Sequence, residues 1–243
     1  MPRSVIVCSP SSRSYRRNER FVNTTQLEAV AAAFSTLARL HLHAPDGDTL
    51  AELQTIYPEW PLQESYTGIT TAPETARGLQ LWAASFNAHE DAEAIADDLN
   101  LLYGRTATAK IAPYESVHRG QDRLIFDEQT LEVRNFYREL NLEAPHLNRE
   151  PDDHIGLEFD FIAQAATLWL TALEHNAPHD AERYRNAVVT FHKEHLSQWA
   201  PEFLENAEKL ADTKFLQGML ALSQGALRMA DSGLMDSGFT NIS

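Results

Sequence analysis

Acidic residues and a histidine gather in one short stretch, EPDDH at 150–154, and Glu158 follows four residues later. Carboxylates and an imidazole can move protons, hold a metal or bind arginine side chains. A proline with acids around it also suits a first helical turn, which by itself accounts for Pro151. His154 and Glu158, however, share a helix face where the sequence becomes almost wholly apolar, and buried polar groups need partners. The stretch therefore indicates either an internal polar network or a ligand site.

Other catalytic patterns are weaker. The Glu-x-x-His spacing from which helical bundles build di-iron sites occurs twice, at Glu115–His118 and at Glu143–His146. The first pair lies in an aperiodic stretch and the second contains a proline, so neither is expected to project from a regular helix. No Gly-x-Ser-x-Gly turn or glycine-rich phosphate loop occurs, and Cys8 is the single cysteine. The sequence predicts no metal site, no cofactor and no catalytic nucleophile.

The elements that must position these residues are helices. The 243 residues include only 10 Gly and 11 Pro, and no stretch alternates β-branched with polar residues. Apolar residues instead recur at intervals of three and four. The predicted helices lie at about 25–43, 48–57, 73–86, 91–103, 127–140, 151–173, 180–199 and 201–220. A capping-box spacing at Thr25 begins the first. We therefore expect an all-α fold, a helical bundle of about eight or more helices.

The helix that we expect to begin at Pro151 is the longest, and it is apolar on nearly all sides, which implies burial. The predicted helices form two halves, residues 22–104 and 124–235, which a long loop at 105–123 joins into one domain. Residues 1–21 precede that domain as a basic tail that we expect to be disordered. A loop of this length would let two copies exchange helices, so a monomer and a domain-swapped dimer both stay open.

The charge balance argues against nucleic acid as a ligand. The chain carries 20 Lys and Arg against 35 Asp and Glu, a net charge of −15. Five arginines against one glutamate make the first 20 residues +4, which leaves −19 for the rest. Phosphate recognition needs a concentrated basic surface, whereas an acidic body suits a basic ligand.

The expected location is the reducing cytoplasm, because one cysteine excludes an intramolecular disulfide. No run approaches the roughly 20 apolar residues of a membrane span, so we expect no membrane insertion. The pair Arg16-Arg17 looks like a twin-arginine export signal, but polar residues follow it where such a signal needs an apolar stretch.

Three stretches resemble the TorD/DmsD family of redox-enzyme maturation chaperones. They are EPDDHIGLEF at 150–159, APYESV at 112–117 and HLSQWAPEF at 195–203. The resemblance spans about residues 22–230 and implies a cytoplasmic helical chaperone, not an enzyme. Such a chaperone binds the twin-arginine leader of a molybdenum-cofactor oxidoreductase subunit, here most like the dimethyl-sulfoxide-reductase type, until cofactor insertion and folding are complete. The first helix has fewer aromatic residues than is common in the family, and the basic tail is no part of the pattern, so the cargo stays open.

The resemblance also implies where the leader binds. Pro151, Asp153 and His154 follow the family motif, with Asp153 and Glu158 receiving arginines or orienting His154. A leader presents guanidinium groups beside an apolar segment, so its receptor should offer carboxylates next to an apolar groove. The further candidate residues, which include the expected aromatic wall, are Tyr114, Glu115, Trp82 and Trp199.

Two other hypotheses compete with this one. The first is a metal-dependent hydrolase or oxygenase in a helical bundle, using Asp153, His154, Glu158 and the histidines at 192 and 195. The second is an interaction module whose basic tail binds an acidic surface, such as its own groove.

Overall fold

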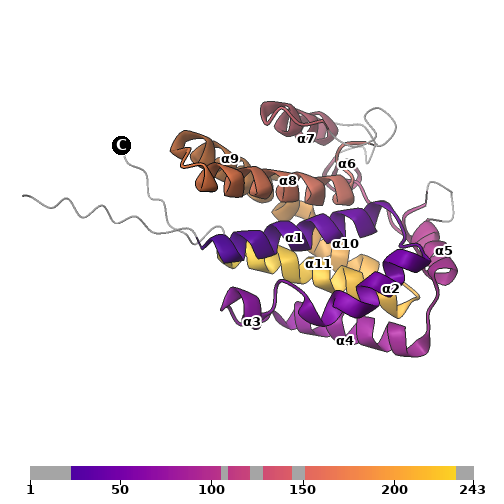
Figure 1. Cartoon of the computed structure of the whole chain (residues 1–243). Coiled ribbons are helices and arrows are strands. Elements are labelled where there is room, and N and C mark those ends of the chain that lie inside the picture. Colours follow the sequence, from indigo (N-terminus) through magenta and orange to yellow (C-terminus); the bar gives the residue numbers. More distant parts are fainter. Residues whose placement is uncertain (1–22, 105–108, 121–127, 144–150, 234–243) are drawn as a thin grey trace, which may run out of the picture.

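The computed structural model describes residues 23–104, 109–120, 128–143 and 151–233, and every regular element in these ranges is helical (Figure 1). The α-helices are α1 (Thr24–Leu42), α2 (Gly47–Ile56), α3 (Glu64–Thr67), α4 (Pro73–Ala88), α5 (Ala92–Tyr103), α6 (Glu115–Arg119), α7 (Glu128–Glu139), α8 (Ile155–Glu174), α9 (Pro178–Phe191), α10 (Ser197–Leu210) and α11 (Lys214–Gly233). A 3-10 turn, Tyr57–Glu59, follows α2, and a π-helical segment, η2 (His192–Leu196), joins α9 to α10. The expected all-α fold is confirmed.

Three helices, α1, α8 and α11, form the centre of the molecule. α8 packs against α1 and α9, and α11 packs against α1, α4 and α10. Figure 1 shows α8, α9 and α7 on one side of α1, with α11 and α4 on the other. Since α1 and α4 precede the loop at 105–123 while α8 and α11 follow it, the two halves inferred from the sequence pack against one another.

The predicted burial of α8 on several sides is confirmed. On one side Phe159 packs on Phe34 of α1, with ring centroids 4.7 Å apart, and on another Phe161 packs on Phe191 of α9 at 4.3 Å. All four rings are fully buried. Each such ring contributes about 2–3 kcal/mol by leaving water, so α8 is the hydrophobic spine. α11 is equally long, at 20 residues.

Glycines let α4 and α11 approach closely. A Cβ placed on Gly218 would lie 2.4 Å from Cδ1 of Trp82, and one on Gly78 would lie 2.8 Å from the carbonyl oxygen of Gly218. No side chain fits at either position without moving its neighbours. The backbones of the two helices therefore meet with almost nothing between them.

Local capping sets several helix starts. Asp91 accepts from Ala94 N at 2.9 Å and begins α5 as predicted. The first helix begins slightly earlier than expected, since Asn23, rather than Thr25, provides its cap by accepting from Gln26 N. In both cases a short polar side chain satisfies an otherwise unpaired backbone N–H.

The prediction that α8 begins at Pro151 is wrong. Its N-cap is His154, whose Nδ1 accepts from Gly156 N at 3.0 Å, and residues 151–153 form a turn before it. The carboxylates of Asp152 and Asp153 bond to other elements instead of to the first turn of α8. Acids before an apolar run suggested a helix start, but tertiary partners moved that start by four residues.

The prediction of one helix over 201–220 is also wrong. α10 ends at Leu210 and α11 begins at Lys214. Asp98 of α5 accepts from the backbone N–H groups of Asp212 and Thr213 at 3.0 and 2.7 Å, and Glu90 accepts from those of Lys214 and Phe215. Carboxylates from the α4–α5 region thus cap the start of α11 and hold the break open.

The expected break near residue 200 is absent. α9, η2 and α10 run without interruption from Pro178 to Leu210, with Pro201 in the first turns of α10. A proline lacks the N–H of a regular helical bond, and the preceding π-helical segment already alters the bonding pattern there.

The segment 105–123 is not wholly a loop. Within its described part, residues 109–120, α6 forms at Glu115–Arg119. The predicted basic tail lies outside the described residues. None of the described helices combines the length and apolar character needed to cross a membrane.

Candidate functional site

Two stretches far apart in the sequence meet at the beginning of α8. Ile155 N donates to the carbonyl oxygen of Pro113 at 2.8 Å, and Tyr114 and His154 form an isolated antiparallel bridge. The backbone before α6 and the turn before α8 are therefore bonded side by side. This junction joins the APYESV and EPDDH stretches into one site.

Asp153 ties three elements together at this junction. Its Oδ2 accepts from Ser116 N at 2.8 Å, its Oδ1 accepts from the hydroxyl of Thr130 in α7 at 2.6 Å, and its carbonyl oxygen accepts from Glu115 N at 3.0 Å. The side chain is fully buried. Asp153 therefore satisfies its carboxylate inside the protein and fixes α6 and α7 against the start of α8.

Glu115 places a second fully buried carboxylate beside it. Its Oε2 lies 2.7 Å from Nδ1 of His195 in η2, and its Oε1 is paired with the guanidinium of Arg119 one turn later in α6. Arg119 also donates to the carbonyl oxygen of Glu194 at 2.9 Å. Glu115 therefore connects α6 to η2, and the partly exposed Arg119 pairs with its other oxygen.

Glu158 is the third buried carboxyl. Its Oε2 accepts from Nε1 of Trp199 at 3.1 Å, while its Oε1 has no hydrogen-bond partner among the described residues. Burial, and then the charge of Glu115, raise the pKa of Glu158 well above its ordinary value. The site therefore favours Glu158 in its neutral, protonated form.

His154 has a structural role in the N-cap described above and an aromatic setting. Its ring lies edge-on to Tyr103 and Tyr114, with centroids 6.3 and 5.4 Å away. Burial lowers the pKa of the nearby His41 to about 3. His41 lies 3.2 Å from the hydroxyl of Tyr103 and 2.9 Å from that of Ser223, so the polar network reaches α11.

Asp152 extends the network toward α7. Its Oδ2 is paired with Nε of Arg134, and its Oδ1 has no partner among the residues that the structure describes. Asp152 is fully buried, whereas the Arg134 side chain is 18% exposed. In this pair, as in the Glu115–Arg119 pair, a fully buried carboxylate is paired with a partly exposed arginine.

The structure brings together seven of the eight candidate residues. They are Tyr114, Glu115, Pro151, Asp153, His154, Glu158 and Trp199, and all seven are buried. The expected open carboxylate surface is therefore replaced by an internal network. Trp82 lies apart, in the α4–α11 contact, where it stacks on Phe215 and donates to that residue's carbonyl oxygen at 3.0 Å.

Sequence reasoning missed the two arginines that complete the network. The spacing of Glu115 and Arg119, four residues apart, is typical of a helical ion pair and could have indicated this one. No local pattern links Arg134 to Asp152, because the two lie on different elements. The metal-dependent hypothesis uses His195 as one of its residues, and the structure instead points it at Glu115.

A pocket of about 510 Å³ adjoins the network from outside, between α7 and η2. Its lining residues are Arg119, Glu132, Asn135, Phe136, Glu139, Lys193, Glu194, His195 and Gln198. Through Arg119 and His195 the pocket reaches both partners of Glu115. It offers carboxylates and an aromatic ring in a hollow at the surface, whereas the carboxyl groups and rings of the junction are buried.

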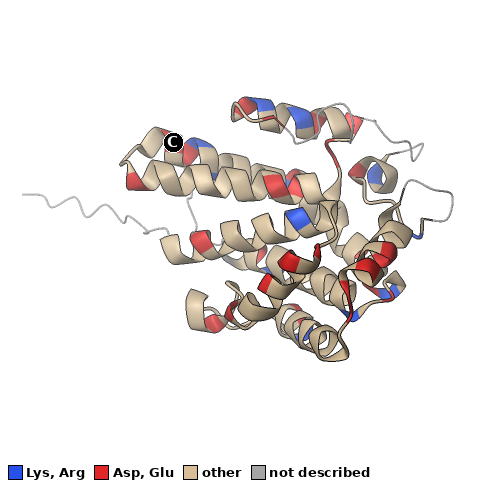
Figure 2. Ribbon diagram, turned by 45° about the vertical axis from the view of Figure 1, so that its right-hand side comes forward, with Lys and Arg blue, Asp and Glu red and all other residues tan. Residues whose placement is uncertain are grey.

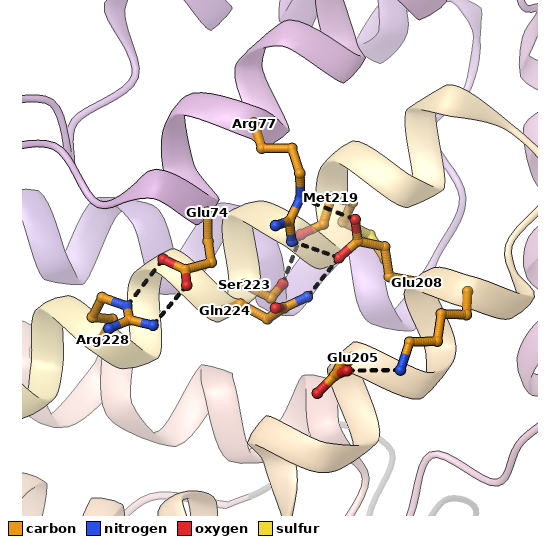
Figure 3. A network of polar contacts seen from close by, with 9 residues as sticks. Glu74, Arg77, Glu205, Glu208, Met219, Ser223, Gln224 and Arg228 are labelled. Carbon is orange, nitrogen blue, oxygen red and sulfur yellow. Dashed lines mark hydrogen bonds and ion pairs between the residues drawn. The ribbon is translucent and has the colours of Figure 1, made fainter.

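A larger groove, of about 1020 Å³, lies between α4, α10 and α11, and none of the candidate residues lines it. Ion pairs line it: Arg228 with Glu74 at 2.6 Å, Arg77 with Glu208 at 2.8 Å, and Lys209 with Glu205 at 2.7 Å. Figure 3 shows the first two pairs. Acidic residues otherwise occur on helices throughout the molecule in Figure 2. Within the described ranges, no group of three or more metal-ligating side chains is arranged to hold an ion.

The fold and the junction define the class: an all-α protein with a buried acid and histidine network at the start of its central helix. Residues 70–205 match the family model described as "Nitrate reductase delta subunit", and the chain belongs to this family, the TorD/DmsD family. All eight candidate residues lie in the matched range.

Individual relatives are similar over shorter stretches. The probable Tat proofreading chaperone DmsD of Haemophilus influenzae is 30% identical over 112 residues, 46% of this chain and 47% of the relative. The selenate reductase assembly chaperone of Thauera selenatis is 33% identical over 114 residues, 45% of this chain and 56% of the relative. The chaperone TorD of Aliivibrio salmonicida is 25% identical over 152 residues, 60% and 69%. The chain thus spans about half the length of the first two.

Proposed function

We propose that this protein is a cytoplasmic assembly chaperone, not an enzyme. In this proposal it binds the twin-arginine leader of a molybdenum-cofactor oxidoreductase subunit and holds it until cofactor insertion and folding are complete. The observation that carries the proposal is the family match over 70–205, a family whose relatives are named as chaperones for Tat proofreading and reductase assembly. Those names give no support to a metal-dependent hydrolase or oxygenase.

The pocket between α7 and η2 is the place where we propose that a leader binds. Glu132, Glu139 and Glu194 supply carboxylates for guanidinium groups, and the ring of Phe136 supplies an apolar wall. Glu115 lies directly behind the pocket, where it is reached through Arg119. This combination suits a peptide in which arginines adjoin apolar residues.

The motif residues act in this proposal by positioning. Asp153 accepts from Ser116 N and from the hydroxyl of Thr130, and His154 accepts from Gly156 N. Together with Pro151 they fix the turn before α8. Glu158 and Trp199 hold α10 against α8 through their hydrogen bond. Tyr114 packs on His154, so the junction as a whole keeps Glu115 behind the pocket.

Leader binding should be reversible, because the peptide must later pass to the export machinery. We expect a Kd near 1 μM, which corresponds to about −8 kcal/mol. The proposal is compatible with a monomer or with a dimer that exchanges helices, and light scattering with and without peptide distinguishes the two.

The test is a titration of the full chain into a fluorescent peptide with adjacent arginines followed by about a dozen apolar residues. We expect a saturable rise in anisotropy, and binding at least about tenfold weaker for the same peptide with two lysines, since lysine cannot form the forked contact. Equal binding of the two peptides would contradict the proposal.

A matched pair of variants tests the junction. His154→Asn keeps a side chain that caps helices well, whereas His154→Ala removes the cap. We expect the Asn variant to bind the leader peptide nearly as the unaltered chain does and the Ala variant to bind it more weakly. Equally weak binding by both variants would show that the imidazole itself contacts the peptide.

A further inference from the structure

The two halves of the Glu115–Arg119 pair lie in different environments. Glu115 is fully buried, yet the arginine that neutralises it has a side chain 32% exposed to solvent. A buried carboxylate left without a cation is costly, so the position facing Oε1 must stay occupied by a positive group. The structure fills that position from the surface side.

Among the described residues, two hydrogen-bond partners hold the guanidinium of Arg119 in this position. It is the last residue of a five-residue helix, and its side chain donates to Glu115 and to the carbonyl oxygen of Glu194. A second guanidinium would keep the buried carboxylate paired, and Arg119 would regain the entropy that a long side chain loses when it is held in one geometry. An exchange of this guanidinium for another one would therefore change the protein's energy little.

A group that enters the pocket comes close to the carboxylate of Glu115. Arg119, Glu194 and His195 belong both to the pocket lining and to the surroundings of Glu115. The lining carries three carboxylates, Glu132, Glu139 and Glu194, against the cations Arg119 and Lys193. A second guanidinium entering the pocket meets an excess of negative charge and the ring of Phe136 before it reaches Glu115.

We propose that Arg119 is an internal stand-in for the ligand: an arginine of the bound leader displaces it and takes its place on Glu115. This inference rests on the proposed function. The exchange keeps the buried carboxylate paired throughout. The incoming group needs only one nitrogen in that place, because the same nitrogen of Arg119, Nη1, donates both to Glu115 Oε1 and to the carbonyl oxygen of Glu194.

Arg134 provides a matched comparison within the same network. It too pairs with a fully buried carboxylate, that of Asp152, but it does not line the pocket. An effect specific to exchange should therefore appear at Arg119 and not at Arg134, whereas a general loss of stability should appear at both.

The experiment compares leader affinity in the full-length chain and in Arg119→Gln and Arg134→Gln. The apparent affinity for the peptide is reduced in proportion to the fraction of time that the site is free of Arg119. Removal of Arg119 should therefore tighten binding of the arginine peptide about tenfold. Arg134→Gln should leave that affinity unchanged. Unchanged or weaker binding by a folded Arg119→Gln variant would overturn the inference.

A second measurement needs no folded variant. In the unaltered chain with ¹⁵N-labelled arginine, the side-chain resonance of Arg119 should move to that of a solvated guanidinium when the arginine peptide is added, while that of Arg134 stays. If the peptide binds and the Arg119 resonance does not move, the inference fails and the proposed function stands. If the peptide does not bind at all, the proposed function fails.

Discussion

The junction at the start of α8 and the groove between α4, α10 and α11 both consist of carboxylates paired with arginines, yet they differ in burial. In the junction Glu115 and Asp152 are fully buried. In the groove the arginine of each pair is well exposed, with the side chains of Arg228 and Arg77 62% and 45% accessible (Figure 3). Similar pairs thus have different energies, because removing one partner strands a charge in the junction but not in the groove.

The difference teaches that the density of charged residues is a poor guide to a functional site here. The groove is the larger hollow and carries more ion pairs. The junction is the place where charges are held inside the protein and where the family motif lies. Four changes, in order of decreasing effect, would break or sharpen this contrast.

Loss of the Asp153 carboxylate should have the largest effect. Asp153→Ala leaves Ser116 N and the hydroxyl of Thr130 without their acceptor in a buried site, so we expect a loss of about 3–4 kcal/mol in the free energy of unfolding. Urea denaturation measures it. The exposed Glu52→Ala is the control and should stay within about 0.5 kcal/mol. A small loss in Asp153→Ala would show that the junction is not a stabilising centre.

Acid should weaken the buried region through His41. Its pKa is lowered from 6.5 to about 3, so the folded state binds this proton less readily than the unfolded state does. The stability associated with a neutral His41 is therefore complete above pH 6.5 and is lost as the pH falls toward 3, by roughly 3 kcal/mol between pH 7 and pH 4.

Unfolding measured at pH 7, 5.5 and 4 in the unaltered chain and in His41→Gln tests this expectation. The variant should lose less stability over the same range. Parallel curves for the two proteins would show that His41 is not the group responsible.

Overpacking of the contact between α4 and α11 should cost more stability than the loss of an ion pair in the groove. Gly218→Ala forces a methyl group against Trp82, and we expect a loss of about 1–3 kcal/mol in thermal or urea unfolding. Gly47→Ala is the matched control, because a Cβ there meets nothing within 4 Å. Equal stability of the two variants would mean that the helices separate at no cost.

The smallest effect is expected in the groove itself. Arg228→Gln removes a forked pair in which the guanidinium donates to Glu74 at 3.0 and 2.6 Å, but the arginine is largely exposed. We expect a loss of at most about 1 kcal/mol, which 1 M NaCl reduces further. A loss as large as that of Asp153→Ala would remove the contrast between the two regions.

The sequence predicted what depends on local pattern. The spacing of apolar residues indicated the helices, the helix predicted at 91–103 is present as α5, and the apolar character of α8 on nearly all sides correctly predicted its burial. These features depend on neighbouring residues alone. The break between α10 and α11 could not be predicted in this way, because the carboxylates that cap α11 come from Asp98 and Glu90, more than 100 residues earlier.

The candidate site shows the same division. Motif and residue type identified which side chains meet at the junction. They could not predict that Asp153 would be satisfied by Ser116 and Thr130, nor that Trp82 would lie in another helix contact. Whether a carboxylate faces inward depends on donors that are distant in the sequence, and the local spacing of residues does not reveal such donors.

The π-helical segment has a consequence for how the chain tolerates insertions and deletions. An α-helix turns about 100° per residue, so deleting one residue from η2 would rotate all of α10 by about that angle. Trp199 would then leave Glu158, and the apolar face of α10 would turn toward water. In this part of the chain a change in length therefore disturbs the packing of the whole of α10.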